Sequence, residues 1–149
     1  MLYAESDISI DRPVDAVFDV VSDVDTVPLW MTAVVESRQR PPGPIGVGTE
    51  YEHTVKFLGK RFTTRARTVE CVPPRRLVFR TMDSRFELEI TVTLDPRGPA
   101  TAVREVVRGD AKGFFKVGQP VLASAVQRHL DGSLADLKVL VESQVVAPT

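Results

Sequence analysis

The sequence lacks the residues that build cross-linked or metal-stabilised folds. Its only cysteine among 149 residues is Cys71, so no internal disulfide can form and no cysteine-based zinc site is available. The two histidines, His53 and His129, lie far apart in the sequence and show no metal-binding spacing. There is also no phosphate-binding loop and no Ser–His–Asp order typical of a hydrolase. We therefore expect neither a metal nor a cofactor.

Long apolar runs and an excess of charge are absent as well. No window approaches the roughly 18 apolar residues of a transmembrane helix, and the opening MLYAESDISI lacks the basic and apolar regions of a signal peptide. The formal net charge is −1, which favours neither a nucleic acid nor an anionic membrane as a partner. We expect a cytoplasmic protein with no integral membrane association and no nucleic-acid partner. Its oligomeric state, monomer or homodimer, is left open.

The residues that are present predict one globular domain over residues 1–149, with 43% hydrophobic and 26% charged residues. The alternation in Leu2–Ile10 predicts a first strand. Asp11 and Pro13 then mark the start of a helix, whose apolar stripe is Val14, Val17, Phe18 and Val21. The following DVDTVPLWM contains the single tryptophan, Trp30, and predicts a second short helix before a strand near residues 33–40.

The middle of the chain alternates as a run of antiparallel hairpins. In YEHTVKFLGKRFTTRART, Gly59-Lys60 fits the central positions of a type II′ turn. This turn sets Phe57 opposite Phe62 and, on the outer face, Glu52 opposite Arg67. The predicted inner face then carries Tyr51, His53, Val55 and Phe57, with Phe62, Thr64 and Ala66 from the facing strand.

A second hairpin is predicted in RRLVFRTMDSRFELEITVTL, with Asp83-Ser84 as its turn. This register sets Phe79 opposite Leu88 on the inner face and Arg80 opposite Glu87 on the outer face.

The face of the last strand, near residues 101–109, is decided by charge. If Arg104 and Arg108 pointed inward, two unpaired cations would be buried at a cost of several kcal/mol each. We therefore place both arginines outward, near the acids of the preceding strand. Glu105 then points inward and is an acid on an otherwise apolar face.

Helical spacing of apolar residues predicts a long amphipathic helix from Pro120 to about Val146. Its apolar side carries Leu122, Val126, Leu130, Leu134, Leu137 and Val141. No second long helix is available to pack against it, so it must lie across the sheet. The connection AKGFFKVGQP before this helix contains Phe114 and Phe115. We interpret it either as a mobile lip over a cavity mouth or as a hydrophobic anchor for the helix.

The predicted elements form an α+β pattern of one strand, two short helices, six strands and a long helix. A curved antiparallel seven-stranded sheet wrapped around the C-terminal helix satisfies this pattern and leaves space inside. The segments ISIDRPVDAVFDVVSDVDTVPLWMTAV, VPPRRLVFRT and LADLKVLVES resemble the START-like (SRPBCC) superfamily, in its polyketide cyclase/dehydrase and lipid-transport-like branch, over essentially the whole chain. The resemblance implies a helix-grip fold with an internal ligand cavity, without naming the ligand.

The inward positions predict a cavity lining of Trp30, Tyr51, His53, Val55, Phe62, Thr64, Phe79, Leu88, Glu105, Leu122, Val126 and Leu130. Trp30 is interpreted either as a plug that packs the core or as a wall of the cavity. His53 and Glu105 are the candidates for catalysis, because an imidazole can act as a general base and a carboxyl on an apolar face has a raised pKa unless it is paired. Whether these two residues meet is left open.

Three functions fit these expectations. The first is a carrier or sensor of a small hydrophobic molecule, lipid- or polyketide-like, because an apolar lining with few polar groups suits binding. The second is a polyketide cyclase or dehydratase that uses His53, with Glu105 as a second candidate. The third is a co-chaperone-like interaction domain that uses the outer face of the sheet. The sequence favours the first.

Overall fold

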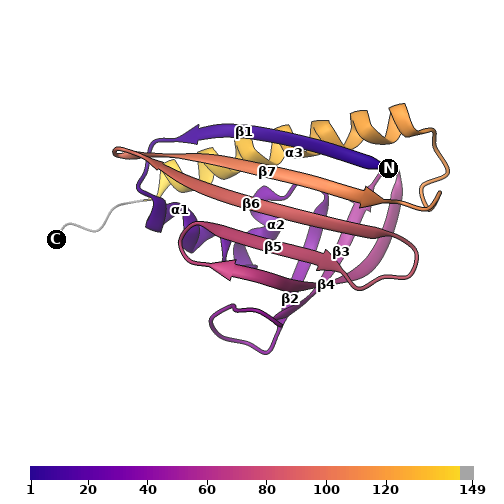
Figure 1. Ribbon diagram of the computed structural model, residues 1–149, viewed down its shortest axis with the longest axis horizontal. Helices are drawn as coiled ribbons and strands as arrows, with labels where there is room; N and C mark the ends of the chain where they lie inside the picture. Colours follow the sequence, from indigo (N-terminus) through magenta and orange to yellow (C-terminus); the bar gives the residue numbers. More distant parts are fainter. Residues whose placement is uncertain (145–149) are drawn as a thin grey trace.

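In the computed structural model, which describes residues 1–144, a curved antiparallel sheet wraps around a long C-terminal helix (Figure 1). The strands are Leu2–Ile10 (β1), Val34–Arg40 (β2), Glu50–Phe57 (β3), Lys60–Val72 (β4), Arg76–Thr81 (β5), Glu87–Arg97 (β6) and Ala100–Asp110 (β7). The helices are Val14–Val21 (α1), the 3-10 turn Val24–Thr26 (η1), Val27–Trp30 (α2) and Gln119–Ser143 (α3). The sheet order is β1-β7-β6-β5-β4-β3-β2. The predicted α+β helix-grip fold is confirmed.

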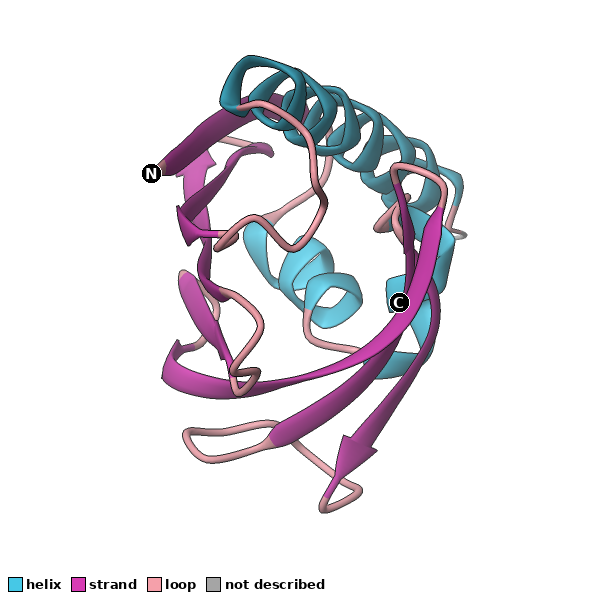
Figure 2. Cartoon of the chain, turned by 90° about the vertical axis from the view of Figure 1, so that its right-hand side faces the viewer, coloured by secondary structure: helices cyan, strands magenta, loops and turns pink. Residues whose placement is uncertain are grey.

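The sheet is strongly curved (Figure 2). Seen from the end, α3 lies along one side of the sheet and the short helices lie between the two ends of the sheet (Figure 2). Neighbouring strands are all antiparallel, and β1 pairs with β7 through a register that sets Leu2 opposite Gly109 and Ile10 opposite Thr101. The first and last strands of the chain therefore lie side by side.

The start of α1 differs from the prediction. The helix begins at Val14, and its N-cap is Pro13, whose extended backbone makes no side-chain capping bond. Asp11 does not cap the helix. Its backbone N–H donates instead to Glu142 Oε2 at 2.8 Å, which ties the end of β1 to the last turn of α3.

The predicted β3–β4 register is wrong by two residues. The turn is Leu58-Gly59, with φ values of 51° and 75°, as in a type I′ turn, whose twist matches that of the flanking strands. Phe57 therefore pairs with Lys60 and not with Phe62. Because side chains alternate along a strand with a period of two, a shift of two residues leaves every side chain on its predicted face.

The predicted β5–β6 register is wrong by two residues as well. Phe79 pairs with Ile90 and Arg80 pairs with Glu89. The turn is wider than Asp83-Ser84 because Asp83 organises it: its Oδ1 accepts a hydrogen bond from the Arg85 backbone N–H at 2.9 Å, and its Oδ2 pairs with the Arg85 guanidinium at 2.6 Å. These bonds, led by the Arg85 side chain, lower the pKa of Asp83 to about 2.

The orientation of β7 follows the prediction. Arg104 and Arg108 are exposed, and Glu105 is buried with 1% of its surface accessible. Arg108 pairs with Glu89 of β6 at 2.8 Å. Arg104 pairs with Glu5 of β1 at 2.6 Å, and not with the acids of β6 as predicted.

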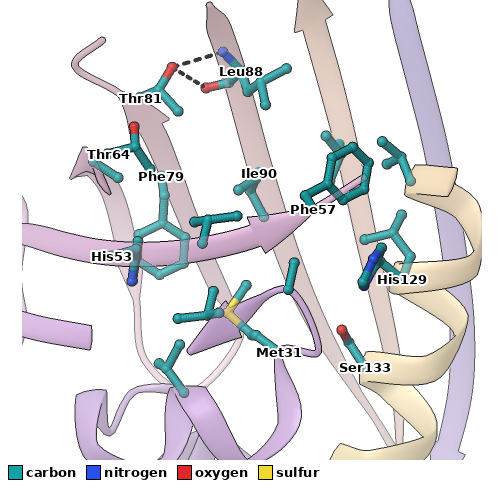
Figure 3. Close-up of a pocket in the computed structure, with 18 of the residues that line it drawn as sticks. Met31, His53, Phe57, Thr64, Phe79, Thr81, Leu88, Ile90, His129 and Ser133 are labelled. Carbon is teal, nitrogen blue, oxygen red and sulfur yellow. Dashed lines mark hydrogen bonds between the residues drawn. The ribbon is translucent and has the colours of Figure 1, made fainter. Parts of the chain in front are cut away.

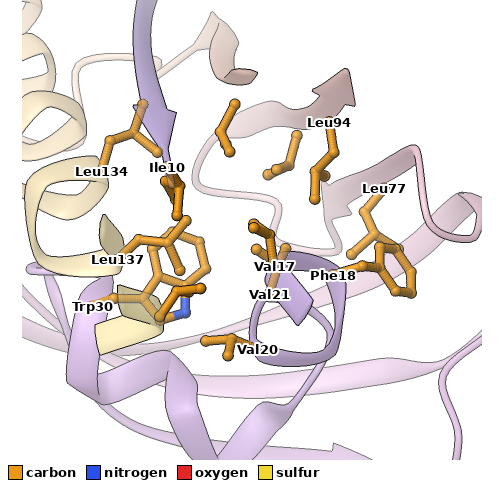
Figure 4. Close-up of a cluster of buried hydrophobic side chains, with 13 residues drawn as sticks. Ile10, Val17, Phe18, Val20, Val21, Trp30, Leu77, Leu94, Leu134 and Leu137 are labelled. Atoms are coloured by element: carbon orange, nitrogen blue, oxygen red, sulfur yellow. The ribbon is translucent and has the colours of Figure 1, made fainter. Parts of the chain in front are cut away.

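The interior of the grip holds a cavity (Figure 3) beside a packed core (Figure 4), and a second buried cluster that includes Leu2, Leu122 and Leu130 contributes to the cavity wall. The core joins α1, α2 and the second half of α3 to the far end of the sheet through Val17, Phe18, Trp30, Leu77, Leu134 and Leu137. The first half of α3 faces the cavity with Leu122, Val126 and Leu130. Within the described residues α3 ends at Ser143, and the predicted end near Val146 lies outside them.

Candidate functional site

A cavity of ≈ 210 Å³ lies between the sheet and the first half of α3 (Figure 3). Every residue that the sequence predicted as lining is found on its wall. That these residues contact a ligand stays a prediction. The wall also includes residues outside the predicted lining, among them Phe57, Thr81, Phe86, Ile90, Phe115, His129 and Ser133.

Five phenylalanine rings form a cluster beside the cavity, and all of them except Phe114 line its wall. They come from three separate parts of the chain and are Phe57, Phe62, Phe86, Phe114 and Phe115. Phe115 meets Phe57 at 5.0 Å between ring centroids, and Phe114 meets Phe62 at 5.1 Å. Lys60 lies over the Phe114 ring at 3.9 Å and donates to its carbonyl oxygen at 3.2 Å. The β7–α3 connection is thus anchored by aromatic packing and contributes Phe115 to the cavity wall.

Most inward hydroxyl groups are satisfied by the protein itself. Thr81 Oγ1 accepts a hydrogen bond from the Leu88 backbone N–H at 2.9 Å (Figure 3). Thr64 Oγ1 donates to Asp83 Oδ2 at 3.1 Å. These groups hold the cavity wall in place, and their hydrogen-bonding capacity is largely used.

His53 lies on β3 in the cavity wall and pairs with Thr64 of β4. Its ring stacks on Tyr51, with centroids 5.9 Å apart and planes within 3° of parallel. Its Nδ1 is buried and has no hydrogen-bond partner among the described residues. Burial lowers the pKa of His53 to about 4, so the imidazole is neutral at pH 7.

Glu105 lies in the middle of β7, between the buried Val103 and Val107. Its Oε2 is buried without a partner among the described residues. Ser6, its cross-strand neighbour on β1, donates its hydroxyl to Asp131 at 2.6 Å and is therefore not available to it. Burial raises the pKa of Glu105 to about 7, because nothing nearby offsets the cost of a charge in an apolar environment.

His53 and Glu105 do not form an acid–base pair. The strands β4, β5 and β6 lie between β3 and β7 in the sheet. Neither residue has a hydrogen bond to the other, and burial is the cause of both pKa shifts. The cavity therefore holds two separate polar groups on opposite parts of its wall.

Trp30 combines the two roles that the sequence left open. It is 2% exposed and belongs to the packed core together with Leu134 and Leu137 of α3 (Figure 4). It also forms part of the cavity wall. Its indole Nε1 is buried without a hydrogen-bond acceptor among the described residues. The tryptophan thus forms the floor between core and cavity.

His129 lies on α3 and forms part of the cavity wall. Its Nδ1 and Thr32 Oγ1 are 2.6 Å apart, and the Thr32 backbone N–H donates to Ser133 Oγ at 3.1 Å. The ring also packs on Phe57 at 5.1 Å. Burial, with a smaller effect of Arg128, lowers the pKa of His129. These contacts fasten the α2–β2 connection to α3 beside the cavity.

Residues 1–144 contain no group of three or more metal-ligating side chains. Among the helices described, none combines the length and the apolar character needed to cross a bilayer.

Comparison with known structures supports the fold. A START superfamily protein from Mycobacterium smegmatis superposes with a TM-score of 0.80 at 14% identity, over 94% of this chain and 97% of that one. The Zhui aromatase/cyclase from Streptomyces sp. R1128 superposes with a TM-score of 0.78 at 16% identity, over 97% and 96%. A protein from Thermus thermophilus gives a TM-score of 0.78 at 17% identity, over 95% and 99%.

No match was found among curated proteins. The family comparison matches residues 1–142 to the family described as polyketide cyclase / dehydrase and lipid transport. This match spans all seven strands and nearly all of α3. Because this match covers nearly the whole chain, it shows that the chain belongs to the polyketide cyclase / dehydrase and lipid transport family.

Proposed function

We propose that the chain binds a small hydrophobic molecule, lipid- or polyketide-like, in its cavity and carries or senses it without converting it. The observation that carries this proposal is the cavity of ≈ 210 Å³, whose wall consists mainly of aliphatic and aromatic side chains. Such a lining with few polar groups is typical of binding sites. The volume lies below the roughly 300–1,000 Å³ of pockets for drug-sized ligands, which favours a compact molecule.

The state of His53 supports binding over catalysis. A general base works best when its pKa lies near the working pH, and the pKa of His53 is lowered to about 4. No acid lies within hydrogen-bonding distance of its Nδ1 among the described residues. A neutral imidazole in this position can still give or accept one hydrogen bond to a ligand.

One observation favours an enzyme as a second candidate. The pKa of Glu105 is raised to about 7, which is where a general acid or base is most effective at neutral pH. A cyclase or dehydratase of the kind suggested by the aromatase/cyclase likeness would thus rely on Glu105 more than on His53. The outer face of the sheet offers no comparable support for a co-chaperone-like role, since Glu89 already pairs with Arg80 and Arg108.

The first experiment is to identify a ligand. Protein purified without detergent is examined by native mass spectrometry for a co-purifying molecule, and fatty acids, aromatic polyketides and sterols are screened by thermal shift. The proposal expects at least one compact apolar compound to bind with one molecule per chain. If no apolar compound binds wild-type protein, the carrier and enzyme proposals both fail.

The second experiment separates carrier from enzyme. In a carrier, His53→Ala removes at most one hydrogen bond, worth about 0.5–1.5 kcal/mol, so affinity falls by roughly 2- to 12-fold. Phe62→Ala, a matched truncation of an apolar wall residue, costs as much or more. In an enzyme, His53→Ala or Glu105→Gln lowers turnover by about 10²–10⁴ with little change in binding. A ligand that is chemically changed by the wild type and only bound by either variant would overturn the carrier proposal.

A further inference from the structure

The buried polar atoms that lack a partner gather at the cavity. Within the described residues, five buried side-chain nitrogen or oxygen atoms have no hydrogen-bond partner. Three of them belong to Trp30, His53 and Glu105, which all line the cavity. Native proteins rarely leave buried polar groups unpaired, and each exception calls for a reason. Their common location suggests that the missing partners belong to a molecule inside the cavity.

Glu105 is the exception with the largest energetic consequence. A buried carboxyl without a hydrogen bond or a countercharge destabilises the folded state far more than an unpaired hydroxyl or indole does. Its inward neighbours on β7, Val103 and Val107, show that an aliphatic side chain fits this part of the strand. The arginines on either side of Glu105 point outward and bind other acids, so no cation of β7 is available to it.

We propose that Glu105 is the polar anchor of the cavity, and that it selects apolar molecules bearing an O–H or N–H donor over molecules of the same shape that bear a carboxylate. This inference rests on the proposed binding function and adds the class of ligand. A carboxyl oxygen accepts a hydrogen bond in either protonation state. A ligand donor can therefore bond to a carboxyl oxygen of Glu105 in either state. A ligand carboxylate can bond only to the neutral form, through its O–H, and it then places two acids on one proton where the described residues supply no cation.

Four other polar residues of the cavity wall agree with this selectivity. The pKa of His53 is lowered to about 4, so the imidazole supplies no positive charge for an anionic ligand at pH 7. The Trp30 indole can donate only a single neutral hydrogen bond. Thr64 and Thr81 already have partners. A free fatty acid would thus have to bury its carboxylate without a countercharge, which is strongly unfavourable.

The test uses four probes that share one apolar frame: para-butylphenol, para-butylbenzylamine, para-butylbenzoate and butylbenzene. Their affinities for the whole protein are measured by isothermal titration calorimetry at pH 7. In the wild type, para-butylphenol should bind about 2- to 12-fold more tightly than butylbenzene, as expected for one net hydrogen bond. The amine should gain about 10- to 100-fold, because its bond to the carboxylate is charge-assisted. The benzoate should bind most weakly of the four.

Two substitutions at Glu105 and one control identify the group responsible. Glu105→Leu should bind butylbenzene at least as tightly as the wild type and lose the preference for the phenol and the amine. Glu105→Gln keeps an acceptor without a charge, so it should keep the phenol preference and lose the amine preference. Glu89→Gln, which removes an acid from the outer face of the neighbouring strand, should leave all four affinities unchanged. Circular dichroism and thermal unfolding of each variant verify that it folds.

The possible outcomes separate this inference from the proposed function. If butylbenzene and the other probes all fail to bind the wild type, the binding function itself is contradicted. If the probes bind but the phenol and the amine show no advantage over butylbenzene, the cavity binds ligands and Glu105 is not its anchor. If the advantage persists in Glu105→Leu, another cavity group provides it. Tight binding of the benzoate by the wild type would also overturn the inference.

Discussion

The stability of this protein should carry a pH signature of Glu105. Burial in the folded protein raises the pKa of this carboxyl from the ordinary 4.5 to about 7. Between these values the folded state keeps a proton that the unfolded chain has lost, so this residue makes the free energy of unfolding fall as pH rises. The difference of about 2.5 pKa units, at about 1.4 kcal/mol per unit, corresponds to on the order of 3 kcal/mol.

The same interior holds a residue with the opposite effect. The pKa of His53 falls from 6.5 to about 4 on folding. The unfolded chain therefore binds the extra proton between those values, and this residue makes the free energy of unfolding rise with pH. From about pH 4.5 to pH 6.5 the two effects nearly cancel in the wild type. Only substitutions of the individual residues can reveal them.

The assay is urea unfolding at a series of pH values, followed by the fluorescence of Trp30. The stability of Glu105→Gln minus that of the wild type should increase by on the order of 3 kcal/mol from about pH 4.5 to pH 7 and then level off. For His53→Gln, the corresponding difference should increase as pH falls from about 6.5 to 4. Arg108 and Arg80 lower the pKa of Glu89, so Glu89→Gln should lose stability near neutral pH and serve as the control of opposite sign. A pH-independent difference for Glu105→Gln would show that its carboxyl has a partner in solution, and the argument would fail.

Three further predictions concern packing. Because Trp30 is 2% exposed, its emission should be blue-shifted and iodide should quench it poorly; strong quenching would contradict its place between core and cavity. Leu137 is fully buried, so Leu137→Ala should lower the free energy of unfolding by about 2–5 kcal/mol in chemical denaturation. Leu29 is 63% exposed, so Leu29→Ala should change the free energy of unfolding by less than about 0.5 kcal/mol. Gly109→Ala would place a Cβ 1.9 Å from the Glu87 backbone oxygen, so it should lower the thermal unfolding midpoint markedly; an unchanged midpoint would mean that the β6–β7 ladder shifts without cost.

The sequence predicted which face each strand buries more reliably than the pairing between strands. The inward positions follow from alternation and from the cost of burying Arg104 and Arg108, and both rules act within one strand. The register depends on the turn, where several residues compete. Gly59 can occupy either central position of a two-residue turn. In the observed turn Leu58 has a positive φ of 51°, which a leucine backbone does not favour. The twist of the paired strands outweighs that local preference.

The site was predictable to a similar degree. The inward face of β3 and β7 placed His53 and Glu105 on the wall, since strand alternation alone requires it. The contact between His129 and Thr32 joins the middle of α3 to the connection after α2, and no pattern within either segment encodes it. The phenylalanine cluster has the same origin, because Phe114 and Phe115 meet Phe57, Phe62 and Phe86 only after the sheet has curled.

The pairing of β1 with β7 has a consequence for the order of events in folding. Contacts between residues so distant in sequence form late and slowly, because the loop that joins them must first be closed at an entropic cost. The hairpins from β3 to β7 can assemble before this closure, but the cavity requires β1 and α3 as well, since Leu2 and Leu122 are part of its wall. A ligand can therefore recognise only the completed chain. It should prolong the life of the folded state by slowing unfolding while leaving the rate of folding unchanged.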